Sequence, residues 1–309
     1  MDSFNTSLFF VAVVPIVVAV LLLLLWRGRS TPKSARDTTI DLVILCREAQ
    51  QMNTTAFARR FQARWNVSLG CAREEGPVPA ESGVAYVLSN AHARLHMQIN
   101  DKPLHEDFTN ALAQAFGPSG TLTEEEIAVM REHKAVVSLF SLKNEGESPL
   151  ESARFVGMVL LTLLESEAML GYTIRSSYGY WTRQSIGGLN AITKVTGDEL
   201  FQLLVNLHVV NESLNHKPHM WIHTHGMDQF QMPDIEMWLP EGTEVAPALD
   251  QITSSAIYMI ETGNPFIAGQ TFDMEGDSSA IHKIAAPRFV SNHDFGSCGA
   301  VQIIPAETT

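Results

Sequence analysis

The chain has 309 residues, of which 45% are hydrophobic and 18% are charged, a composition typical of a globular protein. Its formal net charge of −13 is unfavourable beside a phosphate backbone and no basic patch offsets it, so no nucleic-acid partner is predicted. The three cysteines are scattered and form no CxxC pair, which excludes a disulfide framework and a cysteine-rich zinc site.

The segment from Leu8 to Trp26 carries no charged residue and predicts a membrane helix. At about 1.5 Å of rise per residue, its length suits a hydrocarbon core of about 30 Å. No basic n-region precedes it, so an uncleaved anchor over residues 1–29 is favoured over a signal peptide. Basic side chains follow the segment at Arg27, Arg29, Lys33 and Arg36. By the positive-inside rule, we expect a single-pass protein of the cell membrane with a cytoplasmic C-terminal domain.

Residues 30–39 are polar and contain Pro32, which predicts a tether, and residues 40–309 are predicted to form a single domain. Apolar or alternating runs predict strands over residues 40–46, 84–90, 94–99, 135–142, 207–210, 219–225, 235–238, 288–290 and 300–304. Helical spacing predicts helices over residues 54–65, 108–116, 150–170, 197–206 and 246–262, and one more from Thr123. Because some neighbouring strands have no helix between them, we predict an α+β fold with a mixed, mainly antiparallel sheet packed with helices.

The densest group of chemically capable residues lies between residues 219 and 238. His223 and His225 alternate with apolar residues, so they are expected on one face of a strand. Gly226 then permits a sharp turn, because glycine tolerates positive φ. Asp234 and Glu236 stand in the next alternating run. The sequence therefore places two or three imidazoles and two carboxylates on neighbouring strand ends.

One interpretation of this group is a metal site. Two histidines one residue apart on a strand are a known ligand pair, and a carboxylate can complete a three-ligand zinc site. The string from His223 to Glu236 resembles the JAMM metallo-isopeptidase signature, which implies a zinc-dependent hydrolase with His223, His225 and Glu236 (or Asp234) as ligands. The chain departs from that signature at Gly226, Pro233 and Glu236, where the pattern has Pro, Ser and Asp.

The other interpretation is structural, and the sequence favours it. The same four side chains can hold the turn at Gly226 through hydrogen bonds without any metal or cofactor. The spacing of the other histidines, His208, His216 and His219, fits no standard ligand cage, so they are expected at the surface or in loops. A separate aromatic pair, Tyr180 and Trp181, can line a binding groove or pack in the core.

The segment from Thr224 to Glu236 also resembles an uncharacterised bacterial family of unknown-function domains. That family has a late T-x-G-(M/L)-x-x-F-G-x-P-(D/E)-x-E segment, and the resemblance covers residues 40–238. It implies no activity. The sequence thus predicts a membrane-tethered cytoplasmic binding domain without an intact catalytic motif. Its acidic charge suits a protein partner with a basic surface, and the zinc hydrolase is the alternative.

Overall fold

A computed structural model describes the ranges 38–49, 52–74, 83–107, 109–110, 122–142, 147–174, 176–177, 179–214, 216–273, 281–288 and 298–304. The predicted anchor over residues 1–29 and most of the tether lie outside these ranges, as does most of the helix predicted over residues 108–116. Within them, no helix is both long enough and apolar enough to cross a membrane. The membrane location and its orientation therefore stay predictions.

The fold is α+β, as predicted, but its strands form two sheets and not one. The first is a seven-stranded sheet in the order β2-β3-β4-β5-β1-β6-β7, and every neighbouring pair in it is antiparallel. Its strands are β1 (Thr38–Cys46), β2 (Gly70–Arg73), β3 (Val84–Ser89), β4 (Arg94–Asn100), β5 (Ala135–Leu142), β6 (Met169–Ile174) and β7 (Gly179–Thr182).

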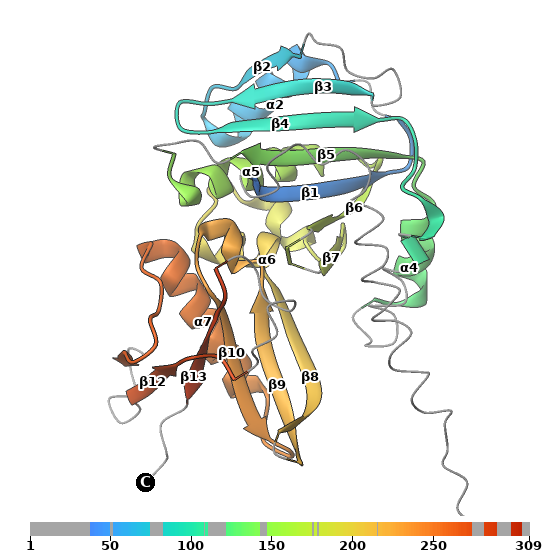
Figure 1. Ribbon diagram of the computed structural model, residues 1–309. Coiled ribbons are helices and arrows are strands. Elements are labelled where there is room, and N and C mark those ends of the chain that lie inside the picture. The colour runs from blue at the N-terminus through green and yellow to red at the C-terminus, as the bar shows by residue number, and fades with distance from the viewer. Residues whose placement is uncertain are drawn as a thin grey trace, which may run out of the picture.

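The second is a six-stranded sheet in the order β11-β12-β13-β10-β9-β8. It is mixed, because β10 and β13 run parallel while the other neighbouring pairs are antiparallel. Its strands are β8 (Asn206–Leu214), β9 (Lys217–His225), β10 (Asp234–Pro240), β11 (Thr271–Asp273), β12 (Ile281–Ala285) and β13 (Ala300–Ile304). Figure 1 shows the long strands of this sheet running across the direction of those in the seven-stranded sheet.

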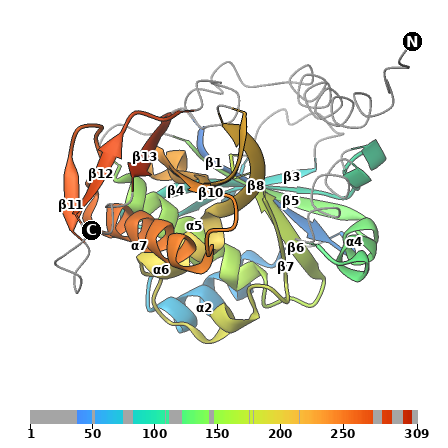
Figure 2. The same ribbon diagram turned by 90° about the horizontal axis from the view of Figure 1, so that it is seen from below.

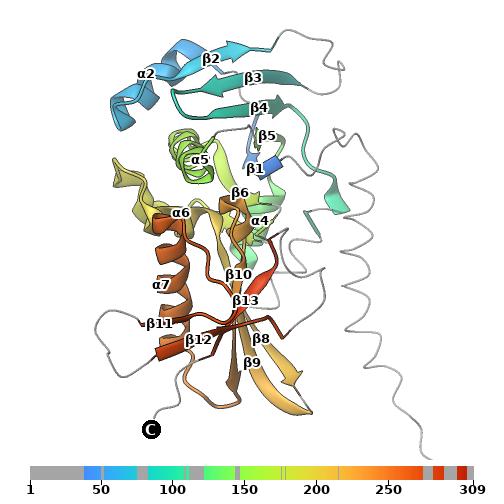
Figure 3. The ribbon, with the colours of Figure 1, turned by 60° about the vertical axis from the view of Figure 1, so that its left-hand side comes forward.

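The helices lie on both sheets and between them. They are α2 (Thr54–Trp65), α4 (Glu124–Arg131), α5 (Pro149–Leu163), α6 (Gly197–Leu204) and α7 (Ala246–Thr262), with short 3-10 helices η1 (Gly187–Ala191) and η2 (Met227–Phe230). Helix α7 runs along one face of the six-stranded sheet, with α6 at its end (Figures 2 and 3).

Local signals explain the helices that were predicted with their observed bounds. The side chain of Asn53 accepts a hydrogen bond from the backbone N–H of Ala56 and so caps α2. Thr123 and Glu126 form a reciprocal capping box that starts α4. The helix predicted over residues 150–170 is too long, because α5 ends at Leu163 and Met169 already begins β6.

A continuous apolar core joins the two sheets. Leu42 and Ile44 of β1 belong to the same cluster of buried side chains as Ile222 of β9 and Met237 of β10. Helix α7 adds its buried face to that cluster, with Ile252 among its members. One face of β9 and β10 is therefore filled by apolar side chains, and the residues of opposite parity, including the histidines, project to the other face.

Candidate metal centre

The stretch that the sequence singles out forms the end of β9, between β8 and β10 (Figure 1). His223 and His225 share one face of β9, because they are two residues apart. In the antiparallel pairing of β8 with β9, His208 lies directly opposite His223. Opposed residues of such a pair project to the same face, with Cβ atoms about 4.5–5.5 Å apart. The register thus brings three imidazoles into one corner of the six-stranded sheet.

The three rings are in close contact. Nε2 of His223 lies 3.1 Å from Nε2 of His225, and the two ring planes are nearly perpendicular. The ring of His208 has its centroid 4.8 Å from that of His225 and 5.2 Å from that of His223. One nitrogen of each ring can be selected so that all three lie within 4.8 Å of one another. Within the described ranges, no other three His, Cys, Asp or Glu side chains bring their ligand atoms together in this way.

Burial keeps these imidazoles neutral. Removal from water, and then the nearby His208, lowers the pKa of His223 to about 3. Burial first and its two neighbours second lower the pKa of His225 to about 2. Burial also lowers the pKa of His208, although a backbone hydrogen bond with Ser177 opposes that shift. The neutral imidazole is the form that binds metal ions, and each neutral ring has one unprotonated nitrogen.

His208 makes polar contacts with the β6–β7 turn and with its own strand. Its Nε2 lies 2.9 Å from the side-chain amide of Asn206, and its ring hydrogen-bonds to the backbone of Ser177. The hydroxyl of Ser177 in turn donates to the carbonyl of Leu204 and accepts from Gln229. The corner therefore lies where the seven-stranded sheet meets the six-stranded one, and His208, only half-buried, is its most exposed ring.

Gly226 is required by the close approach at this turn. Its φ of +110° is rarely adopted by other residues. A Cβ atom there would overlap the hydroxyl of Ser177 and would lie 2.6 Å from the carbonyl oxygen of Leu204. Asp234 secures the same turn, since its Oδ1 accepts from the hydroxyl of Thr224 and from the backbone N–H of Met227. The structural role that the sequence suggests for Asp234 is thus present in these contacts.

Glu236 has a different place from the one that the metallo-isopeptidase resemblance implies. It is fully buried and lies directly opposite His223 on β10. Its Oε2 accepts from the indole N–H of Trp221 at 2.9 Å, and its Oε1 accepts from the backbone N–H of Arg288 at 2.6 Å. Its oxygens are not in the group of converging ligand atoms, where His208 takes the third position. The carboxylate therefore lies beside the site and not among its ligand atoms.

The aromatic pair on β7, Tyr180 and Trp181, has its contacts outside the group of three histidines. Tyr180 is buried in a small apolar cluster on the far face of the seven-stranded sheet, with Val43 and Leu45. Trp181 stacks on Tyr172 at 5.2 Å between centroids and donates to the backbone carbonyl of Gln202. The two side chains point to opposite faces of β7, so they pack in two different layers.

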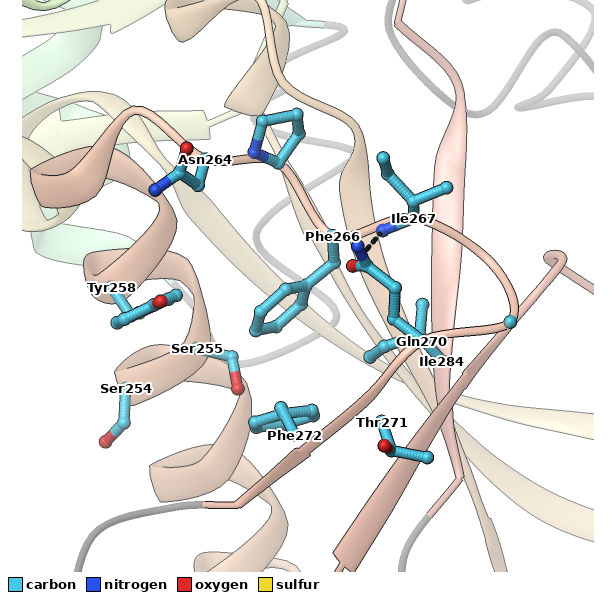
Figure 4. A pocket seen from close by; sticks show the side chains of 12 residues that line it. Ser254, Ser255, Tyr258, Asn264, Phe266, Ile267, Gln270, Thr271, Phe272 and Ile284 are labelled. Atoms are coloured by element: carbon cyan, nitrogen blue, oxygen red, sulfur yellow. Dashed lines mark hydrogen bonds between the residues drawn. The ribbon is translucent and has the colours of Figure 1, made fainter.

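A concave feature lies elsewhere, between α7 and the strands β11 and β12 (Figure 4). This cleft has a volume of about 1190 Å³. Tyr258 of α7 and the rings of Phe266 and Phe272 lie along it, as the sticks in Figure 4 show. Among the residues that the structure describes, its lining includes no His, Cys, Asp, Glu, Lys or Arg. The described lining therefore differs from the histidine corner, where three potential metal ligands converge.

His208 is the member of the site that sequence reasoning missed. It was expected at the surface or in a loop, yet it is half-buried in β8 and faces the pair on β9. The register of the hairpin in which Leu214 pairs with Lys217 would have predicted its position. If a two-residue turn is assumed after Leu214, counting back along both strands places His208 opposite His223.

Comparisons with known proteins give no relative to argue from. No family model, curated protein or solved structure matches the chain. The resemblance of the segment from Thr224 to Glu236 to a bacterial family stays a prediction. What can be said of function therefore rests on the chemistry of the three histidines.

Proposed function

We propose that this protein binds a divalent transition metal, with Zn²⁺ as the best-suited ion, through His208, His223 and His225. The observation that carries the proposal is the convergence of three neutral imidazoles from two adjacent strands. Imidazole nitrogen is a preferred zinc ligand. This proposal replaces the metal-free corner that the sequence favours, because a turn held by hydrogen bonds does not require a third histidine from another strand.

The spacing of the nitrogens supports this proposal. Around a tetrahedral zinc ion with Zn–N distances of about 2.0–2.1 Å, ligand nitrogens lie about 3.4 Å apart. The two Nε2 atoms of His223 and His225 are 3.1 Å apart, close to that value. Without a metal, one of these atoms must carry a proton and donate it to the other. A zinc ion would take the place of that proton between two lone pairs, after a change of tautomer in one ring.

A second candidate function, zinc-dependent hydrolysis, follows from the number of ligands. Structural zinc sites are closed by four protein ligands, whereas catalytic sites use three and leave a position for water or substrate. Within the described ranges, the group contains three ligand side chains, and the half-buried His208 gives it one accessible side. A water molecule bound there would become acidic enough to act as a nucleophile near neutral pH. The ligand set differs from the one expected from sequence, with His208 in place of Glu236.

The test is the metal content of the full-length chain, purified in detergent and exposed to a small excess of zinc. After removal of loosely bound ions, mass spectrometry of the metal should give one zinc per chain. The variants His208→Ala and His223→Ala should each lose that zinc. His219→Ala is the matched control, because His219 also lies on β9 but its ring contacts the backbone of Lys217 and not the other histidines.

Two outcomes would contradict the proposal. A folded wild-type protein that retains no zinc would mean that the corner is structural. Full retention of zinc in His208→Ala, together with loss in His223→Ala, would mean that the third ligand is another residue. Hydrolysis would be pursued only after stoichiometric zinc is found, with simple ester and peptide substrates compared between wild type and His208→Ala.

A further inference from the structure

Glu236 is a buried carboxyl group that lies directly opposite His223 in the strand register. The side chain is fully buried, and no ion pair includes it in the described part of the chain. Both of its hydrogen-bond donors are neutral groups, the indole of Trp221 and the backbone N–H of Arg288. A carboxylate removed from water without a nearby cation is costly. A cation close to Glu236 would remove this cost.

The strand register places Glu236 beside the histidines. His208, His223 and Glu236 lie opposite one another on β8, β9 and β10, so they form one row across the sheet on a common face. Three neutral imidazoles around a dication would leave the charge of +2 unbalanced. The third member of the same row is the carboxyl group of Glu236, which as a carboxylate would supply one charge of the opposite sign.

Trp221 links this carboxylate to a ligand ring. Its indole stacks on the imidazole of His223, with 3.7 Å between ring centroids and 26° between ring planes. The same indole is fixed in its own plane by the hydrogen bond from Nε1 to Oε2 of Glu236. A partial rotation of the His223 ring about its Cβ–Cγ bond would tilt the imidazole away from the indole plane and break the stack. The pair therefore fixes the plane of this imidazole, and in that plane Nε2 faces Nε2 of His225.

We propose that Glu236 and Trp221 are positioning residues of the metal centre, with Glu236 supplying the balancing charge and Trp221 fixing the ring of His223. This inference rests on the proposed metal binding. Such outer groups commonly change metal affinity by about 10–100-fold when they are replaced. They bind no metal themselves, so their replacement should weaken the site without abolishing it.

The experiment compares zinc affinities of the full-length protein and its variants by competition with a chromophoric chelator. Glu236→Gln removes the charge but keeps an oxygen that can accept from Trp221, and it should weaken zinc binding about 10–100-fold. Trp221→Phe keeps a stacking ring but removes the N–H donor, and it should weaken binding less. Trp238→Phe is the matched control, because Trp238 is equally buried, stacks on Trp221 and has no ring contact with His223, so zinc affinity should stay within about twofold.

Substitution of cobalt for zinc gives a second measurement that a merely structural role would not change. The visible absorption of Co²⁺ reports the geometry of its ligands, so Trp221→Phe should alter the spectrum while Trp238→Phe should not. A lower melting temperature of metal-free Glu236→Gln with unchanged zinc affinity would overturn the inference. If Glu236→Gln fails to fold, unchanged affinity and an unchanged cobalt spectrum in Trp221→Phe would overturn it equally.

The two proposals fail in different ways. A wild-type protein that binds neither zinc nor cobalt contradicts the metal centre itself. A wild-type protein that binds zinc stoichiometrically, with variants at Glu236 and Trp221 that bind it equally well, leaves the metal centre in place and removes only the positioning role.

Discussion

Two regions of the described chain that bury histidines differ in the contacts of those histidines. His133 lies between α4 and β5 of the seven-stranded sheet, and both of its ring nitrogens meet the backbone. The N–H of Leu104 donates to Nε2 at 2.9 Å, so Nδ1 carries the proton and donates to the carbonyl of Met130. In the six-stranded sheet, the rings of His223 and His225 direct their Nε2 atoms at each other. The first arrangement joins two chain segments, whereas the second places ring nitrogens around a common point.

The pKa alone does not separate these two regions. Burial lowers the pKa of His133, as it lowers the pKa values of the three histidines on β8 and β9. A backbone hydrogen bond partly opposes the shift both at His133 and at His208. What distinguishes a candidate ligand is the direction of its nitrogens relative to other ligand atoms. Low basicity only ensures that a lone pair is available.

The two sheets also differ in what they bury. Strand β1 has apolar side chains on both faces, with Leu42 and Ile44 in the main core and Val43 and Leu45 in a second cluster. On the face of β9 that carries the histidines, polar groups are buried instead. We therefore expect stability to depend mainly on the seven-stranded sheet and its helices, and metal binding on the six-stranded sheet.

The largest expected effect comes from breaking the main apolar core at α5. Phe155 of α5 is fully buried and makes an edge contact with Phe61 of α2. Replacing it with alanine should lower the free energy of unfolding by about 3–5 kcal/mol, through lost transfer energy and the cavity left behind. Urea denaturation of the metal-free protein measures this loss. Zinc stoichiometry of the folded variant should remain one per chain, and its loss would show that the two regions are not independent.

The next largest effect is the stabilisation of the folded protein by zinc. A ligand that binds only the folded state stabilises it by RT ln(1 + [L]/Kd), about 2.7 kcal/mol at a free zinc concentration of 100 times Kd. Thermal unfolding with and without zinc should show this stabilisation in the wild type and in Phe155→Ala. It should vanish in His223→Ala. Equal stabilisation of His223→Ala would mean that zinc binds elsewhere on the chain.

Local signals in the sequence suffice for much of the fold. Helices α2 and α7 are predicted with their observed bounds, because their apolar periodicity lies within the segment and their end signals stand directly beside it. The division into two sheets is not predicted, since it depends on which distant strands pair. The run that becomes β6 is apolar on both faces, and such a run cannot be told from the end of a buried helix by periodicity.

Strand pairing also limits what the sequence predicts about the histidine site. The pair His223 and His225 is evident from spacing along one strand. The third histidine depends on the register of the β8–β9 hairpin, and no Asn-Gly or Asp-Gly signal marks its turn. Gln231, which replaces the glycine of the family pattern, nevertheless adopts a left-handed conformation with φ of +59°. The turn after Phe230 thus keeps the conformation that glycine favours.

The smallest effect concerns His133 and its dependence on pH. Replacing it with glutamine should lower the free energy of unfolding at pH 7.5 by about 1–2 kcal/mol, because two hydrogen bonds to the backbone are lost or weakened. The pKa of His133 is lower in the folded protein than in the unfolded chain, where it is about 6.5. Its contribution to stability is therefore complete above pH 6.5 and is lost as the pH falls toward the folded pKa.

The difference in stability between wild type and His133→Gln should consequently shrink between pH 7.5 and pH 5. Urea denaturation of the metal-free proteins at several pH values measures this, and titration of the other histidines cancels because both proteins share them. Zinc affinity at pH 7.5 should be the same in both proteins, since His133 directs its nitrogens at the backbone. A constant difference across this range would mean that His133 titrates alike in the folded and unfolded states. A loss of zinc in His133→Gln would contradict the separation between a histidine that joins chain segments and the three that face one another.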